Sequence, residues 1–210
     1  MKIKKQVYPK TTRLSYTAPK AQITEKLDGS NLAIGVSEGK LYICMRNNII
    51  ESSEIGEHKN MLYKGLYAWV NEHEEFLKEE IHEGSVMCGE WLGMGKLKYP
   101  KEMTDKRFFM FAKARFTEDL GLTKIRRERD LLNFCFESHD IPEFIDVVPC
   151  VQILNFFPSV EDCNVIYTEY SECVDRNVEG FVINYLGSIH KYVRMKNGKI
   201  EPHKEGVKND

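Results

Sequence analysis

A stretch of seven residues, 25–31 (EKLDGSN), contains the residue types needed for covalent chemistry with a nucleotide. Lys26 stands between two runs of β-forming residues and is followed by Asp28 and Gly29, so we expect it on a tight connection at the edge of a sheet. An unprotonated lysine amine can attack the α-phosphorus of a nucleoside triphosphate and hold the nucleotide as a phosphoramidate. The stretch is therefore a candidate nucleotidyl-acceptor site.

This chemistry places a requirement on the surroundings of the lysine. A free lysine has a pKa of about 10.4, so keeping its amine neutral at pH 7 costs roughly 5 kcal/mol unless cationic neighbours or a metal ion favour the neutral form. We therefore expect further basic residues downstream. Taken alone, the pattern Lys-x-Asp-Gly is also typical of a hairpin turn with a solvated lysine.

The rest of the sequence predicts strands around this stretch and helices between them. Turn residues at 37–40 predict a β-hairpin from Asn31 to Arg46, which returns Arg46 toward Lys26. Apolar residues at helical spacing predict an amphipathic helix within 61–81, with Trp69 and Phe76 on its apolar face. Residues 1–20 are expected to form an irregular lead-in with one short strand. Further strands are expected at 23–25, 86–91, 107–112, 147–154, 181–185 and 190–195, with helices at 124–138 and from the N-cap Ser159 to Val174. The pattern indicates an α+β fold in which a ligand lies between sheets.

The composition is typical of a soluble globular protein. The 210 residues are 42% hydrophobic and 30% charged with a net charge of −2, so nucleic acid would have to be bound by local basic patches. The sequence has no apolar run of membrane-spanning length and no signal-peptide-like N-terminus, so we expect a cytoplasmic protein, with a phage- or virus-infected host cell as one setting. The six cysteines are scattered without Cys-x-x-Cys pairs, which favours reduced thiols over a zinc site.

Several short motifs follow Lys26 in order. They are Arg46, twenty positions after Lys26; Gly89-Glu90-Trp91 with Gly93; the aromatic run 108–111; Glu179-Gly180-Phe181-Val182-Ile183; and Arg194-Met195-Lys196. In this order they resemble the motifs of the covalent nucleotidyltransferase superfamily of ATP-dependent polynucleotide ligases and capping enzymes. The tail 29–31 and the position of Arg46 are most similar to the RNA ligases, particularly the phage type that seals nicks. The resemblance extends over residues 25–196.

The resemblance implies how a nucleotide would be held. Lys26 would be the nucleophile that becomes adenylylated. Glu25 and its neighbours would contact the adenine edge, and Phe111 would stack on the base. Phe109 is the alternative if the strand register differs by two, since residues two apart in a strand face the same side.

The resemblance also assigns the phosphate contacts. Arg46 would bind a phosphate and the sugar edge, a role suited to a planar guanidinium. Arg194 and Lys196 would bind the α-phosphate and supply the positive charge that the lysine requires. Arg194 stands where this motif commonly has a lysine, and Lys191 lies close enough in sequence to compete for a role.

Three acids complete the implied site. Glu90 would bind the ribose hydroxyl, and Asp28, Glu90 and Glu179 would together hold a hydrated divalent cation, Mg²⁺ or Mn²⁺. Metal and basic groups stabilise charge on the transferring phosphoryl oxygens. The cofactors implied are thus ATP and a divalent metal ion.

The implied fold is an α+β, ATP-grasp-like nucleotidyltransferase domain, with antiparallel sheets flanked by helices and the nucleotide bound between sheets. Only 14 residues follow Lys196, too few for an oligonucleotide-binding barrel, so we expect 1–210 to be a single adenylyltransferase domain. The implied activity is ATP-dependent RNA ligation of 5′-phosphate and 3′-hydroxyl ends, nicked duplexes included, with a partner protein as one source of strand binding. The alternatives are a DNA ligase, a GTP-using capping enzyme, and a non-catalytic nucleotide- or nucleic-acid-binding module.

Overall fold

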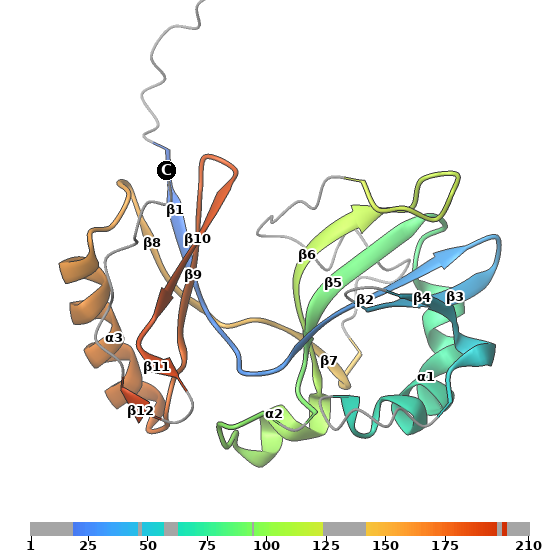
Figure 1. Ribbon diagram of the computed structural model, residues 1–210, viewed down its shortest axis with the longest axis horizontal. Coiled ribbons are helices and arrows are strands. Elements are labelled where there is room, and N and C mark those ends of the chain that lie inside the picture. Colours follow the sequence, from blue (N-terminus) through green and yellow to red (C-terminus); the bar gives the residue numbers. More distant parts are fainter. Residues whose placement is uncertain are drawn as a thin grey trace, which may run out of the picture.

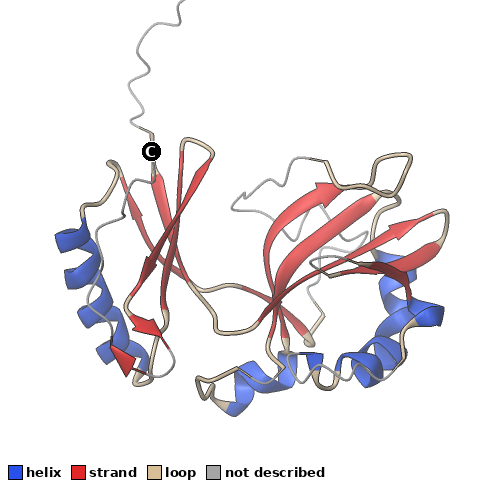
Figure 2. Ribbon diagram, viewed as in Figure 1, coloured by secondary structure: helices blue, strands red, loops and turns tan. Residues whose placement is uncertain are grey.

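The computed structural model describes residues 19–45, 48–56, 63–93, 95–123, 142–196 and 199–200. Runs of strands are separated by single helices along the chain, as expected for an α+β fold (Figure 2). The elements are β1 (Ala21–Glu25), β2 (Ser30–Ser37), β3 (Lys40–Cys44), β4 (Ile49–Glu51), a 3-10 turn (Ser52–Glu54), α1 (Leu66–Glu80), β5 (Ser85–Trp91), α2 (Lys101–Lys106), β6 (Phe108–Arg115), β7 (Ile145–Val147), β8 (Cys150–Leu154), α3 (Val160–Val174), β9 (Gly180–Tyr185), β10 (Ser188–Val193), β11 (Met195–Lys196) and β12 (Lys199–Ile200).

Two main sheets lie side by side (Figure 1). The small sheet has four strands in the order β10-β9-β1-β8, and the large sheet has six in the order β4-β3-β2-β5-β6-β7. A two-stranded ribbon pairs β11 with β12. Because β1 lies in the small sheet and β2 in the large one, residues 26–29 carry the chain from one sheet to the other.

The chain returns to the small sheet between β7 and β8, next to the first crossing. The Val148 N–H donates to the Met110 carbonyl of the large sheet at 2.9 Å, whereas the Pro149 carbonyl accepts from the Glu25 N–H of the small sheet at 2.9 Å. Both connections between the sheets therefore meet beside residues 25–26.

Each sheet has its own hydrophobic core. Helix α3 packs on the small sheet around Ile23, Ile166 and Phe181. Helix α1 packs on the large sheet, where the rings of Trp69 and Trp91 meet edge to face at 5.6 Å between centroids. Within the described residues, no helix is long and apolar enough to cross a membrane.

Most of the predicted local structure is confirmed. The hairpin forms between β2 and β3, with Ser37 paired to Lys40. Trp69 is in the core at 5% exposure. Helix α3 begins at the predicted N-cap, where Ser159 Oγ accepts a 3.1 Å hydrogen bond from the Asp162 N–H and Asp162 Oδ2 accepts a 2.9 Å bond from the Ser159 N–H. This reciprocal pair is a capping box.

The single strand predicted at 147–154 is wrong, because the structure divides this segment between two sheets. β7 lies in the large sheet and β8 in the small sheet, and the chain crosses between them at Pro149, which has no N–H for a strand ladder. The large sheet is also mixed rather than antiparallel, since β7 runs parallel to β6.

Two further details differ from the sequence predictions. Phe76 is 37% exposed, because it lies at the margin of the α1 face, where its ring meets that of Phe144. The short helix α2 was not predicted. The helix expected at 124–138 and the strand expected in the lead-in fall outside the described residues.

We expect Ser159→Ala to lower the free energy of unfolding by about 1 kcal/mol, because the N-cap side chain satisfies an otherwise unbonded N–H of α3. The melting temperature should fall by about 2–4 °C. Thr168→Ala, in the exposed middle of the same helix, is the matched control and should cause no such loss. Equal melting temperatures for the Ser159 variant and the wild type would contradict the capping role.

Candidate active site

A pocket opens between the two sheets where the chain crosses between them. It contains about 470 Å³ of space, part of it continuous with solvent. Its lining comes from both sheets and from the crossing segments. The lining residues are Thr24, Glu25, Lys26, Leu27, Asn31, Glu90, Phe111, Val148, Val182 and Lys191. Three residues proposed for nucleotide binding from the sequence, besides the nucleophile, are thus brought together here.

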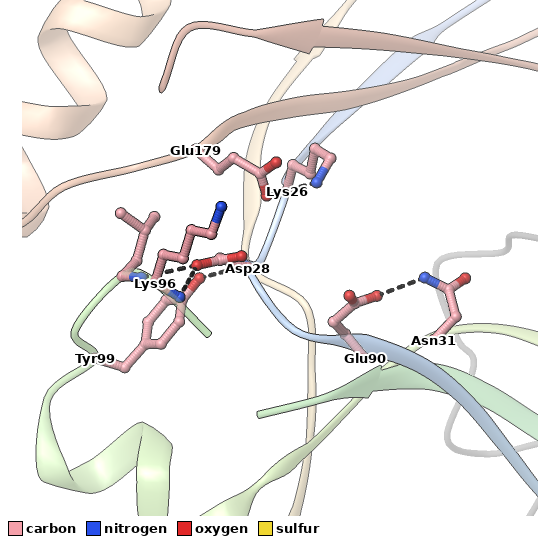
Figure 3. Close-up of polar contacts among 8 residues, drawn as sticks. Lys26, Asp28, Asn31, Glu90, Lys96, Tyr99 and Glu179 are labelled. Atoms are coloured by element: carbon pink, nitrogen blue, oxygen red, sulfur yellow. Dashed lines mark hydrogen bonds and ion pairs between the residues drawn. The ribbon is translucent and has the colours of Figure 1, made fainter. Parts of the chain in front are cut away.

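Lys26 is the first residue after β1, at the point where the chain leaves the small sheet (Figure 3). Its N–H donates to the Gly180 carbonyl at 2.9 Å, which fixes the backbone beside β9. Its ammonium pairs with Glu179 Oε2 at 2.5 Å, and the two side chains are only 22% and 19% exposed. The predicted nucleophile is therefore in direct contact with the glutamate of a motif 153 residues away in sequence.

Asp28 holds a loop of the large sheet against the crossing. Its Oδ2 accepts hydrogen bonds from the N–H groups of Lys96 (2.5 Å) and Leu97 (2.7 Å), and its own N–H donates to the Tyr99 hydroxyl at 2.5 Å (Figure 3). A Cβ at position 95 would lie 2.1 Å from the Asp28 carbonyl oxygen, so only glycine allows this approach. The carboxylate of Asp28 thus makes structural hydrogen bonds to the loop.

Glu90 and Glu179 bring two partly buried carboxylates to the site from opposite sheets. Glu90 accepts a 3.0 Å hydrogen bond from Asn31 Nδ2. Burial raises the pKa of Glu90 to about 7, with the charge of Lys26 opposing the shift and that of Glu179 adding to it. Burial also raises the pKa of Glu179, against the opposing effect of Lys26. The site therefore disfavours the simultaneous ionisation of Glu90 and Glu179 unless a further cation is bound.

These two acids fit a hard divalent cation in their chemistry. Carboxylate oxygens are the ligands that Mg²⁺ and Mn²⁺ prefer, and burial, the cause of the raised pKa values of both groups, limits competition from water. No three Asp, Glu, His or Cys residues in the described part of the chain are grouped closely enough to form a direct metal site. Shared binding of one cation by Asp28, Glu90 and Glu179 through water stays a prediction.

The structure distinguishes the two candidate stacking residues. The pairing of β6 with β5 skips Phe111, which leaves a β-bulge at that residue. Phe111 is half-buried and lines the pocket. Phe109 is 2% exposed and packs in the core beside Leu27. Phe111 is thus the aromatic residue available to a base in the pocket.

Of the predicted phosphate-binding cations, the structure describes the side chain of Arg194. Arg46 lies outside the described residues, and the side chain of Lys196 is not among the described ones. Arg194 lies outside the pocket lining, with its guanidinium donating to Asn164 Oδ1 of α3 at 3.0 Å. Lys191, noted from the sequence as a competitor, lines the pocket.

The chain was compared with models of known protein families. Residues 19–196 match the RNA ligase family, a span that includes every described residue of the pocket. The chain belongs to the RNA ligase family. No match of comparable significance was found among curated proteins.

Solved structures of the Naegleria gruberi RNA ligase have a similar fold. An apo variant is 17% identical with a TM-score of 0.50, and a variant with ATP and Mn is 17% identical with a TM-score of 0.51. A third variant, with AMP and Mn, is also 17% identical with a TM-score of 0.51. Each alignment covers 84% of this chain and 50% of the other, so the chain spans about half the length of these structures.

The Glu25 side chain lies on the face of the small sheet that α3 covers. In the small sheet, Glu25 is in register with Phe181 of β9, and Phe181 with Tyr192 of β10, and both aromatic rings pack in the α3 core. Residues in one such row face the same side of a sheet. The Glu25 carboxylate therefore faces α3 rather than the pocket, and an adenine contact through its side chain stays an untested prediction.

Sequence reasoning missed the residues that hold this carboxylate. Arg176 donates to Glu25 Oε1 at 2.5 Å and Oε2 at 2.6 Å, and the Tyr170 hydroxyl donates to Oε2 at 2.8 Å. The Arg176 guanidinium also lies over the Tyr99 ring, 5.3 Å from its centroid, which connects α3 to the loop held by Asp28. Arg176 stands three residues before Glu179 in a polar stretch, and no spacing in the sequence indicates its partner.

We expect Arg176→Ala to destabilise the protein strongly, by about 3–5 kcal/mol, because it leaves the buried Glu25 carboxylate without a counter-ion. The measurement is the free energy of unfolding in urea. Lys40→Ala, which breaks an exposed pair with Glu51, is the control and should leave stability within experimental error. The double variant Glu25→Gln/Arg176→Ala should be more stable than Arg176→Ala. A mild effect of Arg176→Ala would rule out the ion pair as a main support of β1.

Glu90→Gln should stabilise the metal-free protein at alkaline pH. Since the pKa of Glu90 is about 7 when folded against an ordinary value of 4.5, the native state retains a proton that the unfolded chain loses in this window. Stability therefore falls as pH rises from about 4.5 to 7, and Gln removes that penalty. At about pH 8 we expect a gain on the order of 1–3 kcal/mol, and none at about pH 4. Urea unfolding with a chelator at both values is the measurement, and a pH-independent difference would contradict the shift.

Proposed function

We propose that this chain is the nucleotidyltransferase part of an ATP-dependent RNA ligase that works through a lysyl-AMP intermediate. The observation that carries the proposal is the position of Lys26, which lies in a pocket between two sheets and contacts Glu179 at 2.5 Å. Membership of the RNA ligase family supports the assignment. The finer assignment to the phage-type, nick-sealing ligases rests on the Gly29-Ser30-Asn31 tail and on the spacing of Arg46 from Lys26.

In the first step the amine of Lys26 attacks the α-phosphorus of ATP. A nitrogen–phosphorus bond forms, the bond from the α-phosphorus to the oxygen of the β-phosphate breaks, and pyrophosphate leaves. The ammonium loses one proton before the attack and a second as the nitrogen–phosphorus bond forms; Glu179 is the carboxylate positioned at 2.5 Å to accept one, and the other passes to water. The hydrogen bond from the Lys26 N–H to Gly180 keeps the nucleophile at the pocket while this happens.

Other pocket residues would orient the nucleotide. Phe111 presents its ring to the base, and Glu90 lies within the same lining to accept a hydrogen bond from a ribose hydroxyl. Positioning is the main task of a protein in phosphoryl transfer, because the transition state needs alignment and charge stabilisation. The two sheets thus provide opposite walls for one nucleotide.

Glu90 and Glu179 are the residues that fit a divalent cation, with Asp28 as a water-mediated neighbour. When bound, Mg²⁺ or Mn²⁺ would neutralise charge on the phosphate oxygens. The Naegleria gruberi ligase structures with ATP and Mn, which share this fold, are in line with that pairing of nucleotide and metal.

Two further steps would complete ligation. An oxygen of an RNA 5′-phosphate attacks the adenylyl phosphorus, breaks the bond to Lys26 and forms a pyrophosphate link between AMP and the RNA end. A 3′-hydroxyl then attacks the RNA phosphorus, forms the phosphodiester and releases AMP. RNA ends, in a nick or otherwise, are therefore the substrates that we propose.

The test is incubation of the protein with Mg²⁺ and ATP labelled at the α-phosphate. We expect covalent label on the wild type and on the control Lys40→Ala, and none on Lys26→Ala, since the amine of Lys26 is the one proposed to attack the α-phosphorus. Circular dichroism of each variant checks folding. Label from GTP instead of ATP would indicate a capping-type enzyme, and no label from either would indicate a binding module. Sealing of RNA but not DNA ends by the labelled protein would separate an RNA from a DNA ligase.

A further inference from the structure

The strands of the small sheet place alternate residues on opposite faces. Thr24 of β1 is in register with Val182 of β9, and Val182 with Lys191 of β10. All three residues line the pocket. Lys191 is thus the end of a row that forms the wall of the pocket on the small sheet.

Tyr192 of β10 and Arg194, the residue that follows this strand, face the other way. The Tyr192 hydroxyl donates to Asn164 Oδ1 at 2.6 Å, and Arg194 donates to the same oxygen at 3.0 Å. Asn164 belongs to α3, which covers the face of the small sheet opposite the pocket. The alternation that directs Tyr192 and Arg194 to α3 directs Lys191 to the pocket.

The geometry points to Lys191 as a cation that binds the α-phosphate of the nucleotide held at Lys26, the role that the sequence motif gives to Arg194 and Lys196. This inference rests on the proposed nucleotidyltransferase function. Lys191 lies outside the motif 194–196. The register of β10 with β9, and not the spacing of the motif, places it in the pocket.

The chemistry of the reaction makes such a cation necessary. Among the described residues that line the pocket, the only lysines and arginines are Lys26 and Lys191. Once Lys26 forms its bond to phosphorus, its nitrogen no longer carries a full positive charge, while the adenylyl phosphate remains anionic. Lys191 is then the one cation of this lining that can balance the phosphate. Its compact ammonium on a flexible, exposed stem can follow the phosphate as the bond forms.

Binding of AMP and adenosine to the metal-free protein separates the phosphate contact from catalysis. AMP and adenosine differ only in the phosphate, so the ratio of their dissociation constants measures what the phosphate adds. We expect Lys191→Ala to weaken AMP binding by about tenfold or more with adenosine binding unchanged, because a charge-assisted hydrogen bond to the phosphate is lost. Lys191→Arg, which keeps the charge, should retain most of the AMP preference. Isothermal titration calorimetry in a chelating buffer gives these constants.

Two comparisons decide the assignment. Arg194→Ala should lower the melting temperature through loss of the Asn164 contact but keep the AMP-to-adenosine ratio within about twofold of wild type, because its guanidinium faces α3. An unchanged ratio in Lys191→Ala, or a collapse of the ratio in Arg194→Ala, overturns the inference. If the wild type binds AMP and is labelled at Lys26 while Lys191→Ala behaves as wild type, the ligase function stands and only this assignment fails. If the wild type binds neither AMP nor adenosine, both fail.

Discussion

Two backbone hydrogen bonds at residues 25 and 26 join the parts of the molecule on which the site depends. The Glu25 N–H donates to Pro149, where the chain returns from the large sheet, and the Lys26 N–H donates to Gly180 at the start of β9. The nucleophile is therefore held by segments more than a hundred residues away in sequence. Because both crossings between the sheets meet here, the pocket opens at the place where Lys26 leaves its strand.

Two partly buried carboxylates, those of Glu90 and Glu179, set the charge environment of Lys26. The Lys26 Nζ lies 2.5 Å from Glu179 Oε2, so the amine is in direct contact with a carboxylate. Burial meanwhile makes Glu90 a weak acid with a pKa of about 7. In the proposed reaction, a divalent cation held by Glu90 and Glu179 would supply positive charge for both carboxylates. The unfavourable environment of Glu90 is a stability cost of the kind that functional sites often carry.

A separate set of contacts, remote from the reacting atoms, keeps this geometry rigid. Asp28 binds two consecutive N–H groups of the loop before α2, and Tyr99 of that loop bonds back to the Asp28 N–H. Arg176 lies over the Tyr99 ring and binds the Glu25 carboxylate, so the residues on both sides of Lys26 are connected through one network. Glu25 and Asp28, the acids on either side of Lys26, thus hold the backbone around Lys26 in position.

The sequence by itself determined the local structure and the order of the motifs. The hairpin, the capped helix α3, the strand that carries Glu90 and the strand that follows Glu179 depend on the propensities and patterns of short segments. The tertiary structure alone decided where the side chains point. A strand pattern shows that Glu25 and Thr24, or Arg194 and Lys191, face opposite sides, but the docking of α3 on one face determines which side is core and which is pocket. Pro149 divides one predicted strand between two sheets for the same reason, since the partners of each half lie far away in the chain. Long-range pairing fixes these orientations, and no short segment contains that information.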